Sequence, residues 1–223
     1  MQFSKKKFLI ALIFLTVILL ILVRDPLLSA FQNYQLAQIN CNTGNCKGKI
    51  WAHRVNSIKR YNILENQFNG FETDIYYNEE KNIFEVVHPP VNDKYEILPL
   101  ESFLRNVNLE KSRFWFDGRG INSTNSVKAL QVLNSIRDKF PGIKNCIIEL
   151  YDTKAAKEFS GNGWIVSLNI PEEFLMNDVA INKFKEEIEQ IEDISYFSQQ
   201  AALVPKIKEH FPHKKIITWH LQF

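Results

Sequence analysis

Apolar runs of strand length recur along residues 50–223 and alternate with stretches of helical periodicity. The runs are rich in β-branched and aromatic residues and are bounded by turn residues, which is the pattern of β-strands. Most carry few polar residues, as expected of strands that are covered on both faces in a parallel sheet. The predicted strands are 50–54, 70–77, 83–88, 113–117, 145–151, 163–169, 194–197 and 215–221.

Four of the intervening segments carry an apolar stripe at helical spacing. Ser57 can cap the first, Pro141-Gly142 ends the second, and Pro205 suits the first turn of the last. The predicted helices are 57–68, 126–140, 177–192 and a last helix from about Pro205 to near Phe211. Strand–helix alternation predicts an α/β fold with parallel strands, either a doubly wound sheet or a (β/α) barrel.

The polar residues favour the barrel, because they fall late in successive strands. They are His53, Arg54, Glu72, Asp74, Asp117, Arg119, Glu149, Trp219 and His220. In a barrel the C-terminal ends of the strands meet at one mouth, where sites are built. We therefore predict a TIM-type (β/α) barrel over residues 50–223. The sequence stops at Phe223, soon after the last predicted strand, so a barrel that is incomplete at its C-terminus stays an open alternative.

A different pattern precedes the barrel. Residues 8–23 are apolar except for Thr16, and Lys5-Lys6-Lys7 comes before them. The run falls between the lengths of a signal-peptide core and a spanning helix, so a transmembrane anchor and a cleaved signal peptide both stay open. The lysines favour a cytoplasmic N-terminus. We predict a signal anchor or signal peptide over 1–30, a linker over 31–49, and a barrel that is membrane-anchored on the exported, extracytoplasmic side, or secreted if the segment is cleaved.

The linker contains two cysteines, Cys41 and Cys46, in a Gly/Asn-rich stretch. In an exported protein a small disulfide loop is the natural interpretation of this pair. A metal site is the rival, but no second Cys or His pair has suitable spacing. The third cysteine, Cys146, lies in a predicted apolar strand and is expected to be a buried thiol.

The composition and charge of the chain argue against two classes of protein, disordered proteins and nucleic-acid-binding proteins. The chain has 223 residues, of which 45% are hydrophobic and 23% charged, so a packed core is expected and global disorder is not. The formal net charge is +2 and no basic stripe is present, which argues against nucleic acid as a partner.

The candidate chemistry centres on the predicted strand 70–77. Side chains two apart on a strand share a face, so Glu72 and Asp74 are neighbours. Two buried carboxylates are unfavourable unless a positive group lies between them. His53 and His88, on the flanking strands, can exchange protons near neutral pH. These residues predict a hard cation with an acid/base pair, which suits cleavage of a phosphate ester. Glu149 can contact that site or form a structural salt bridge.

The motifs resemble the glycerophosphodiester phosphodiesterase family, within the phospholipase C-like phosphodiesterases. The resemblance rests on His53-Arg54 ending the first strand, Glu72-Thr73-Asp74 on the second, His88 shortly after, the segment 98–104, Asp117-Gly118-Arg119 and Ile217-Thr218-Trp219. It covers residues 50–120 well and the remainder loosely. It implies a metal-dependent phosphodiester hydrolase that acts on a small-molecule or lipid-derived phosphodiester.

The resemblance also implies roles for individual residues. Glu72, Asp74 and Asp117 would hold a divalent cation, Mg²⁺ or Ca²⁺. His53 and His88 would be the catalytic acid and base. Arg54 and Arg119 would bind the substrate phosphate.

The chain departs from the family pattern at three places, and these departures support an alternative function. Pro89-Pro90 follows the second His, where the family usually has Asp. Asp117 and Arg119 stand where the family usually has Glu and Lys. The sequence also stops early. The alternative is therefore a catalytically inactive barrel that acts as a membrane-anchored binding module.

Overall fold

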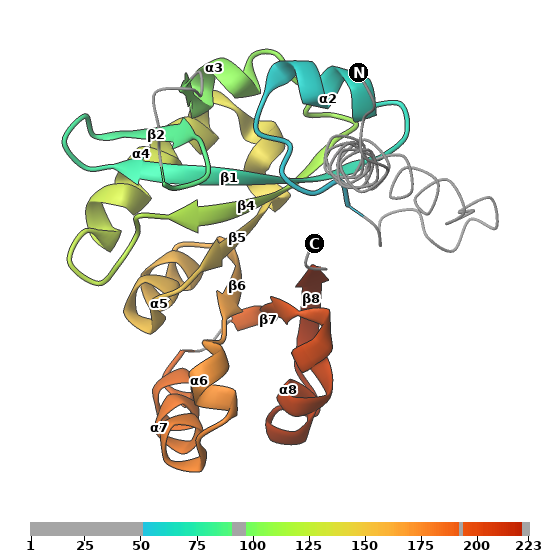
Figure 1. Cartoon of the computed structure of the whole chain (residues 1–223). Helices are drawn as coiled ribbons and strands as arrows, with labels where there is room; N and C mark the ends of the chain where they lie inside the picture. The colour runs from blue at the N-terminus through green and yellow to red at the C-terminus, as the bar shows by residue number, and fades with distance from the viewer. Residues whose placement is uncertain (1–50, 91–96, 192–193, 220–223) are drawn as a thin grey trace, which may run out of the picture. The chain divides into compact units, whose positions relative to one another are not determined.

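The computed structural model describes residues 51–90, 97–191 and 194–219 (Figure 1). The chain divides into two compact units, 1–47 and 48–223, and all described residues belong to the second. The predicted anchor, the linker with Cys41 and Cys46, and His220 lie outside the described residues. No helix within the described ranges is long and apolar enough to cross a membrane.

Eight strands form one sheet in the order β3-β2-β1-β4-β5-β6-β7-β8. From β1 to β8 all neighbours are parallel, whereas β2 is antiparallel to β1 and β3 to β2. The strands are β1 (Gly70–Asn78), β2 (Ile83–Val86), β3 (Leu98–Pro99), β4 (Arg113–Arg119), β5 (Ile147–Leu150), β6 (Ile165–Asn169), β7 (Ile194–Gln200) and β8 (Lys215–Trp219).

The helices lie between the strands and cover the outside of the sheet (Figure 1). They are α2 (Ile58–Leu64), α3 (Leu100–Leu104), α4 (Ser126–Lys139), α5 (Thr153–Gly161), α6 (Glu172–Leu175), α7 (Asp178–Glu189) and α8 (Val204–His210), with 3₁₀ turns η2 (Pro141–Asn145) and η3 (Ala201–Leu203). The predicted helices correspond to α2, α4, α7 and α8. The prediction of an α/β fold with a mostly parallel sheet is confirmed.

Two predicted strands differ from a regular parallel array. The first is reduced to a single parallel bridge between Ala52 and Phe71, with a further hydrogen bond of 2.8 Å from the Val55 N–H to the Glu72 carbonyl. The strand predicted at 83–88 is antiparallel, because a short turn folds it back on the second half of β1 as a hairpin. The edge of β1 that faces away from β4 therefore pairs with two partners, the segment around Ala52 and β2.

The sheet is strongly curved. Trp115 on β4 and Trp219 on β8 are four ladder steps apart, which in a flat sheet is about 19 Å. Their ring centroids nevertheless lie 6.1 Å apart. Both side chains therefore point to the inside of a rolled sheet, as in a barrel. Among the described residues no ladder joins β8 to the segment around Ala52.

The two faces of the sheet have opposite character because alternate residues point to opposite sides. The outer face packs against the helices, and one aromatic cluster there joins Tyr61 of α2 and Phe103 of α3 to Phe71 and Phe114 of the sheet. The inner face carries the buried polar residues. They include Glu72, Asp74, Asp117, Glu149, Ser167, Asn169 and Ser198. This polar interior positions the candidate site.

Candidate active site

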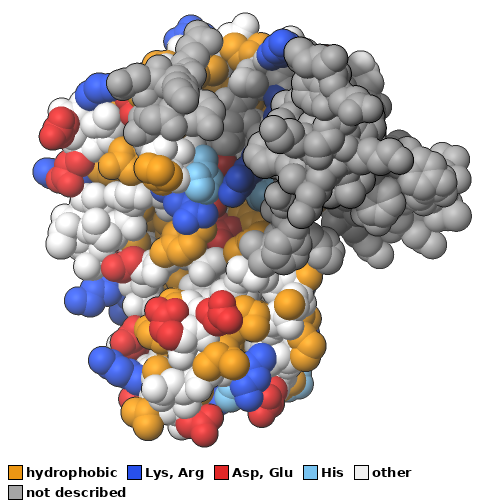
Figure 2. All heavy atoms as spheres, viewed as in Figure 1, with side chains coloured by type: hydrophobic (Ala, Val, Ile, Leu, Met, Phe, Trp, Pro, Cys, Tyr) orange, Lys and Arg blue, Asp and Glu red, His pale blue; other side chains and the backbone are white. Residues whose placement is uncertain are grey.

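All seven residues that the sequence predicted for the site line one cavity of about 140 Å³ at the C-terminal ends of the strands. Its lining consists of His53, Arg54, Glu72, Asp74, His88, Trp115, Asp117, Arg119, Glu149 and Trp219. Figure 2 shows basic, acidic and histidine side chains gathered in the middle of this face. The structure thus brings together groups that are far apart in the sequence.

Three buried carboxylates form the floor of the cavity. Glu72 and Asp74 come from β1, and Asp117 lies directly opposite Asp74 on the parallel neighbour β4. Each residue offers one oxygen, and these oxygens all lie within 4.8 Å of one another. Oxygen ligands at this spacing suit a hard divalent cation such as Mg²⁺ or Ca²⁺.

The protonation equilibria of these acids show how unfavourable the cluster is without a cation. Burial raises the pKa of Glu72 well above its ordinary value, and the charge of Asp74 adds to the shift. Burial raises the pKa of Asp117 to about 6, with repulsion from Asp74 opposed by Arg119. A divalent ion would remove this penalty, because it favours the deprotonated carboxylates. The residues present therefore fit the metal that the sequence predicted.

The two histidines lie beside different carboxylates. His53 Nε2 is 3.5 Å from Glu72 Oε2, and His88 Nε2 is 3.8 Å from Asp74 Oδ1. Burial lowers the pKa of His53, and the charge of Arg54 lowers it further. His53 is therefore neutral at physiological pH and able to accept a proton. Both imidazoles are within reach of a group held above the carboxylates.

Backbone geometry fixes the position of Arg54. Its φ of 57° lies in the left-handed region, and its N–H donates a 2.6 Å hydrogen bond to Glu72 Oε2. Its guanidinium forms no ion pair with any residue that the structure describes. The backbone thus orients Glu72 while the side chain stays available to an anion.

Asn56 is a further polar residue of the site that the sequence pattern did not indicate. Its Nδ2 donates to Asp74 Oδ2 at 2.6 Å, and its Oδ1 accepts the Asp74 backbone N–H at 2.9 Å. This reciprocal pair holds the Asp74 carboxylate in one orientation. The residue follows the predicted strand 50–54 by two positions, but no pattern of spacing indicated which way its side chain points.

Arg119 and Tyr151 converge on Asp117. Arg119 Nη2 donates to Asp117 Oδ2 at 2.5 Å, and the Tyr151 hydroxyl donates to Oδ1 at 2.9 Å. The Arg119 guanidinium also lies over the Tyr151 ring, 4.4 Å from its centroid. Tyr151 comes just after β5 and was not a predicted site residue.

Glu149 is a fourth buried carboxyl in the cavity, and it forms no salt bridge within the described part of the chain. Burial raises its pKa to about 8, although Asn169 Nδ2 donates a 3.0 Å hydrogen bond to it. At neutral pH it is therefore mostly protonated. A neutral carboxyl adds no repulsion to the other three acids.

A larger groove of about 860 Å³ lies on the outer side of the sheet, between β2, α3 and α4. Its two acids are paired: Glu79 with Lys128 at 3.3 Å, and Glu101 with Lys139 at 2.8 Å. It lacks the clustered carboxylates and histidines of the smaller cavity. The groups that could carry out a reaction therefore lie in the smaller cavity, at the mouth of the curved sheet.

Comparison with known proteins supports the fold. No protein-family model matches the chain, and no curated protein sequence matches it. Solved structures do match. A glycerophosphodiester phosphodiesterase from Parabacteroides distasonis superposes with a TM-score of 0.60 at 15% identity, over 77% of this chain and 83% of that one.

Two further structures give the same result. The glycerophosphodiester phosphodiesterase from Thermotoga maritima has a TM-score of 0.56 at 16% identity, over 77% of this chain and 84% of that one. An Oleispira antarctica phosphodiesterase, in complex with the product sn-glycerol-3-phosphate, has a TM-score of 0.55 at 9% identity, over 77% and 83%. The chain thus has the fold of the glycerophosphodiester phosphodiesterases. The resemblance predicted from the motifs is confirmed at the level of the fold.

Proposed function

We propose that this protein is a metal-dependent phosphodiester hydrolase of the glycerophosphodiester phosphodiesterase type. The observation that carries the proposal is the buried group of Glu72, Asp74 and Asp117, flanked by two histidines in one cavity of a fold that those enzymes share. We also infer that the curved sheet is a TIM-type barrel, with its seam between β8 and the segment around Ala52.

The three carboxylates would hold Mg²⁺ or Ca²⁺. That ion would draw charge from a phosphate oxygen and so stabilise the transition state. Arg54, whose guanidinium forms no ion pair with a described residue, would bind a second phosphate oxygen by charge-assisted hydrogen bonds. Arg119 has fewer N–H groups available to the phosphate, because its Nη2 already donates a hydrogen bond to Asp117.

The histidines supply the proton transfers. His53, held neutral by its lowered pKa, would take the proton from an attacking water as the new P–O bond forms. His88 would then donate a proton to the leaving alkoxide as the old P–O bond breaks. A hydroxyl of the substrate could replace water as the nucleophile, and a cyclic phosphate would then be the first product.

The substrate class follows from the size and charge of the cavity. A space of about 140 Å³ fits a phosphate group with a small alcohol, such as a glycerophosphodiester or the head group of a lipid-derived diester. We propose that residues 8–23 attach the enzyme to the membrane, with the catalytic domain on the extracytoplasmic side. This topology would place the site near lipid-derived diesters.

The test is a hydrolysis screen of the full-length protein over phosphodiesters, from glycerophosphocholine to lysophospholipids, with Mg²⁺, Ca²⁺ or Mn²⁺. We expect metal-dependent cleavage that Glu72→Gln abolishes while the fold is kept. Glu85→Gln is the matched control, since Glu85 is a buried acid outside the cavity that pairs with Lys81. If the wild type binds a cation but cleaves none of these diesters, the protein is a binding module instead.

A further inference from the structure

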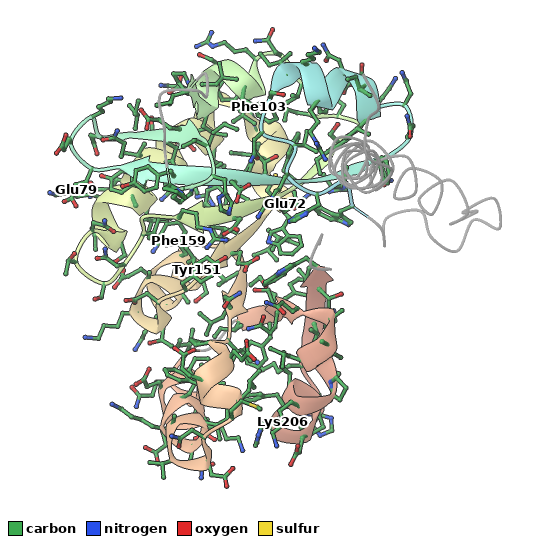
Figure 3. The ribbon with its side chains drawn as sticks, in the orientation of Figure 1. Glu72, Glu79, Phe103, Tyr151, Phe159 and Lys206 are labelled. Atoms are coloured by element: carbon green, nitrogen blue, oxygen red, sulfur yellow. The ribbon has the colours of Figure 1, made fainter. Side chains whose placement is uncertain are left out.

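Tyr151 stands outside the predicted motifs, yet its side chain contacts both Asp117 and Arg119. It follows the last residue of β5, and Figure 3 marks it together with Glu72 of β1. Its hydroxyl reaches Asp117 Oδ1 and its ring lies under the Arg119 guanidinium. One residue therefore contacts a candidate metal ligand and a candidate phosphate-binding group through two different parts of its side chain.

The hydroxyl has a defined effect on Asp117. With Oδ1 accepting from Tyr151 and Oδ2 accepting from Arg119, the carboxylate plane cannot rotate without breaking one of these bonds. Each oxygen keeps a second lone pair, and the ligand oxygen of Asp117 stays within 4.8 Å of those of Glu72 and Asp74. The phenol stays protonated, because burial and the nearby Glu149 and Asp117 raise its pKa.

The ring has a separate effect on Arg119. A guanidinium that lies over an aromatic face is attracted to it by a cation–π interaction. Arg119 Nη2 is bound to Asp117, but its buried Nε has no hydrogen-bond partner among the described residues. A buried donor without a partner is unfavourable unless a ligand satisfies it. The ring contact thus holds the guanidinium, with this unpartnered N–H, in the wall of the cavity that Arg119 lines.

We propose that Tyr151 is a positioning residue of this site, whose hydroxyl orients Asp117 toward the cation and whose ring presents Arg119 to the substrate phosphate. The proposal rests on the proposed function for its ligands. The hydroxyl and the ring of Tyr151 thus have different roles, which different substitutions can test. Tyr151→Phe removes the hydroxyl and keeps the ring, whereas Tyr151→Leu removes both.

The two variants should differ in measurable ways. Tyr151→Phe should lower the affinity for Mn²⁺ or Mg²⁺ by roughly 10-fold or more, the usual effect of removing a hydrogen bond that orients a metal ligand. Its KM for a diester should stay within about twofold of the wild type, because the stacking remains. Tyr151→Leu should in addition raise KM by roughly five- to tenfold, since the cation–π contact is lost.

Tyr77→Phe is the matched control. Tyr77 also donates one hydroxyl hydrogen bond, to Asn82 Oδ1 at 2.8 Å, but it lies outside the cavity. Its variant should leave metal affinity and KM unchanged, whatever it does to stability. Tyr151 is 36% exposed, so neither substitution should prevent folding. Isothermal calorimetry of metal binding, done on full-length protein, is the primary readout and does not depend on turnover.

The outcomes separate this proposal from the proposed function. If the wild type turns over no diester but binds metal, the enzymatic function fails, while weaker metal binding by Tyr151→Phe alone still supports the positioning role. If the wild type binds no metal, sn-glycerol 3-phosphate serves as the probe, and weaker binding by Tyr151→Leu supports the role of the ring. Metal affinity of Tyr151→Phe within twofold of the wild type, or unchanged binding of that probe by Tyr151→Leu, overturns the proposal.

Discussion

The clustered carboxylates predict an unusual pH dependence of folding stability in the metal-free protein. Burial raises the pKa of Asp117 from 3.8 to about 6, a difference of about two units, which corresponds to roughly 3 kcal/mol. A carboxyl whose folded pKa is raised binds its proton more tightly in the folded state. Its contribution is therefore fully present below pH 3.8 and is lost as pH rises through about 6.

About half of that loss, roughly 1.4 kcal/mol, falls between pH 5 and pH 8. Glu72 and Glu149 add losses of the same sign, because their pKa values are also raised. His53 acts in the opposite direction. Its folded pKa is lowered, so its contribution is present above pH 6.5 and is lost as pH falls. The net expectation is a metal-free protein that is more stable at pH 5 than at pH 8.

Urea denaturation of the full-length protein in a chelator, at pH 5, 6, 7 and 8, measures this dependence. Asp117→Asn is the reference, because it deletes the contribution of Asp117 and retains that of His53. The wild type should lose at least about 1.4 kcal/mol more than this variant between pH 5 and pH 8. A cation at 100 times its Kd should add about 2.7 kcal/mol to the wild type at pH 8. Equal pH dependence of the two proteins would falsify the electrostatic reasoning.

Four further predictions concern single features of the chain. His53→Ala should keep metal affinity near the wild-type value in calorimetry but lower turnover by roughly 10²-fold or more, and full activity would remove His53 from the mechanism. Asn56→Ala should weaken metal binding by about 10-fold, because the Asp74 carboxylate loses the hydrogen bond from Asn56 Nδ2 that orients it; unchanged affinity would contradict this. The full-length protein should fractionate with membranes, and Cys41 and Cys46 should resist thiol labelling before reduction; soluble, fully labelled protein would refute both expectations.

The site residues could be predicted because three simple rules place them. Alternation along β1 puts Glu72 and Asp74 on one face, and parallel neighbours bring Asp117 level with Asp74. The third rule, that parallel strands end at the same edge, adds His53 and Arg119. These rules depend only on sequence spacing and on strand direction. They hold even though the first predicted strand is reduced to a single bridge at Ala52.

Tyr151 lies in the predicted strand 145–151, where a period of two places it on the face of Glu149, but no motif marked it as a partner of Asp117. Asn56 could not be predicted from such rules, because it stands beyond the end of the first predicted strand. The direction of a side chain there depends on the turn that follows and not on a period of two. The left-handed backbone at Arg54 sets the path of the chain that brings Asn56 to Asp74. The hairpin direction of β2 was missed for a related reason. Its apolar run resembles a buried parallel strand, and only the short turn before it reveals the reversal.

The charge of the cavity gives a physical reason for a diester substrate. Once a bound cation has driven deprotonation of Glu72, Asp74 and Asp117, these carboxylates and the two arginines together carry one negative charge, while Glu149, whose pKa is about 8, stays protonated. A divalent cation changes that to one positive charge, which a phosphodiester monoanion would neutralise. A phosphate monoester near neutral pH carries close to two negative charges and would leave these groups with a net negative charge again. Counted over the carboxylates, the arginines and the cation alone, this balance favours the diester over its monoester product.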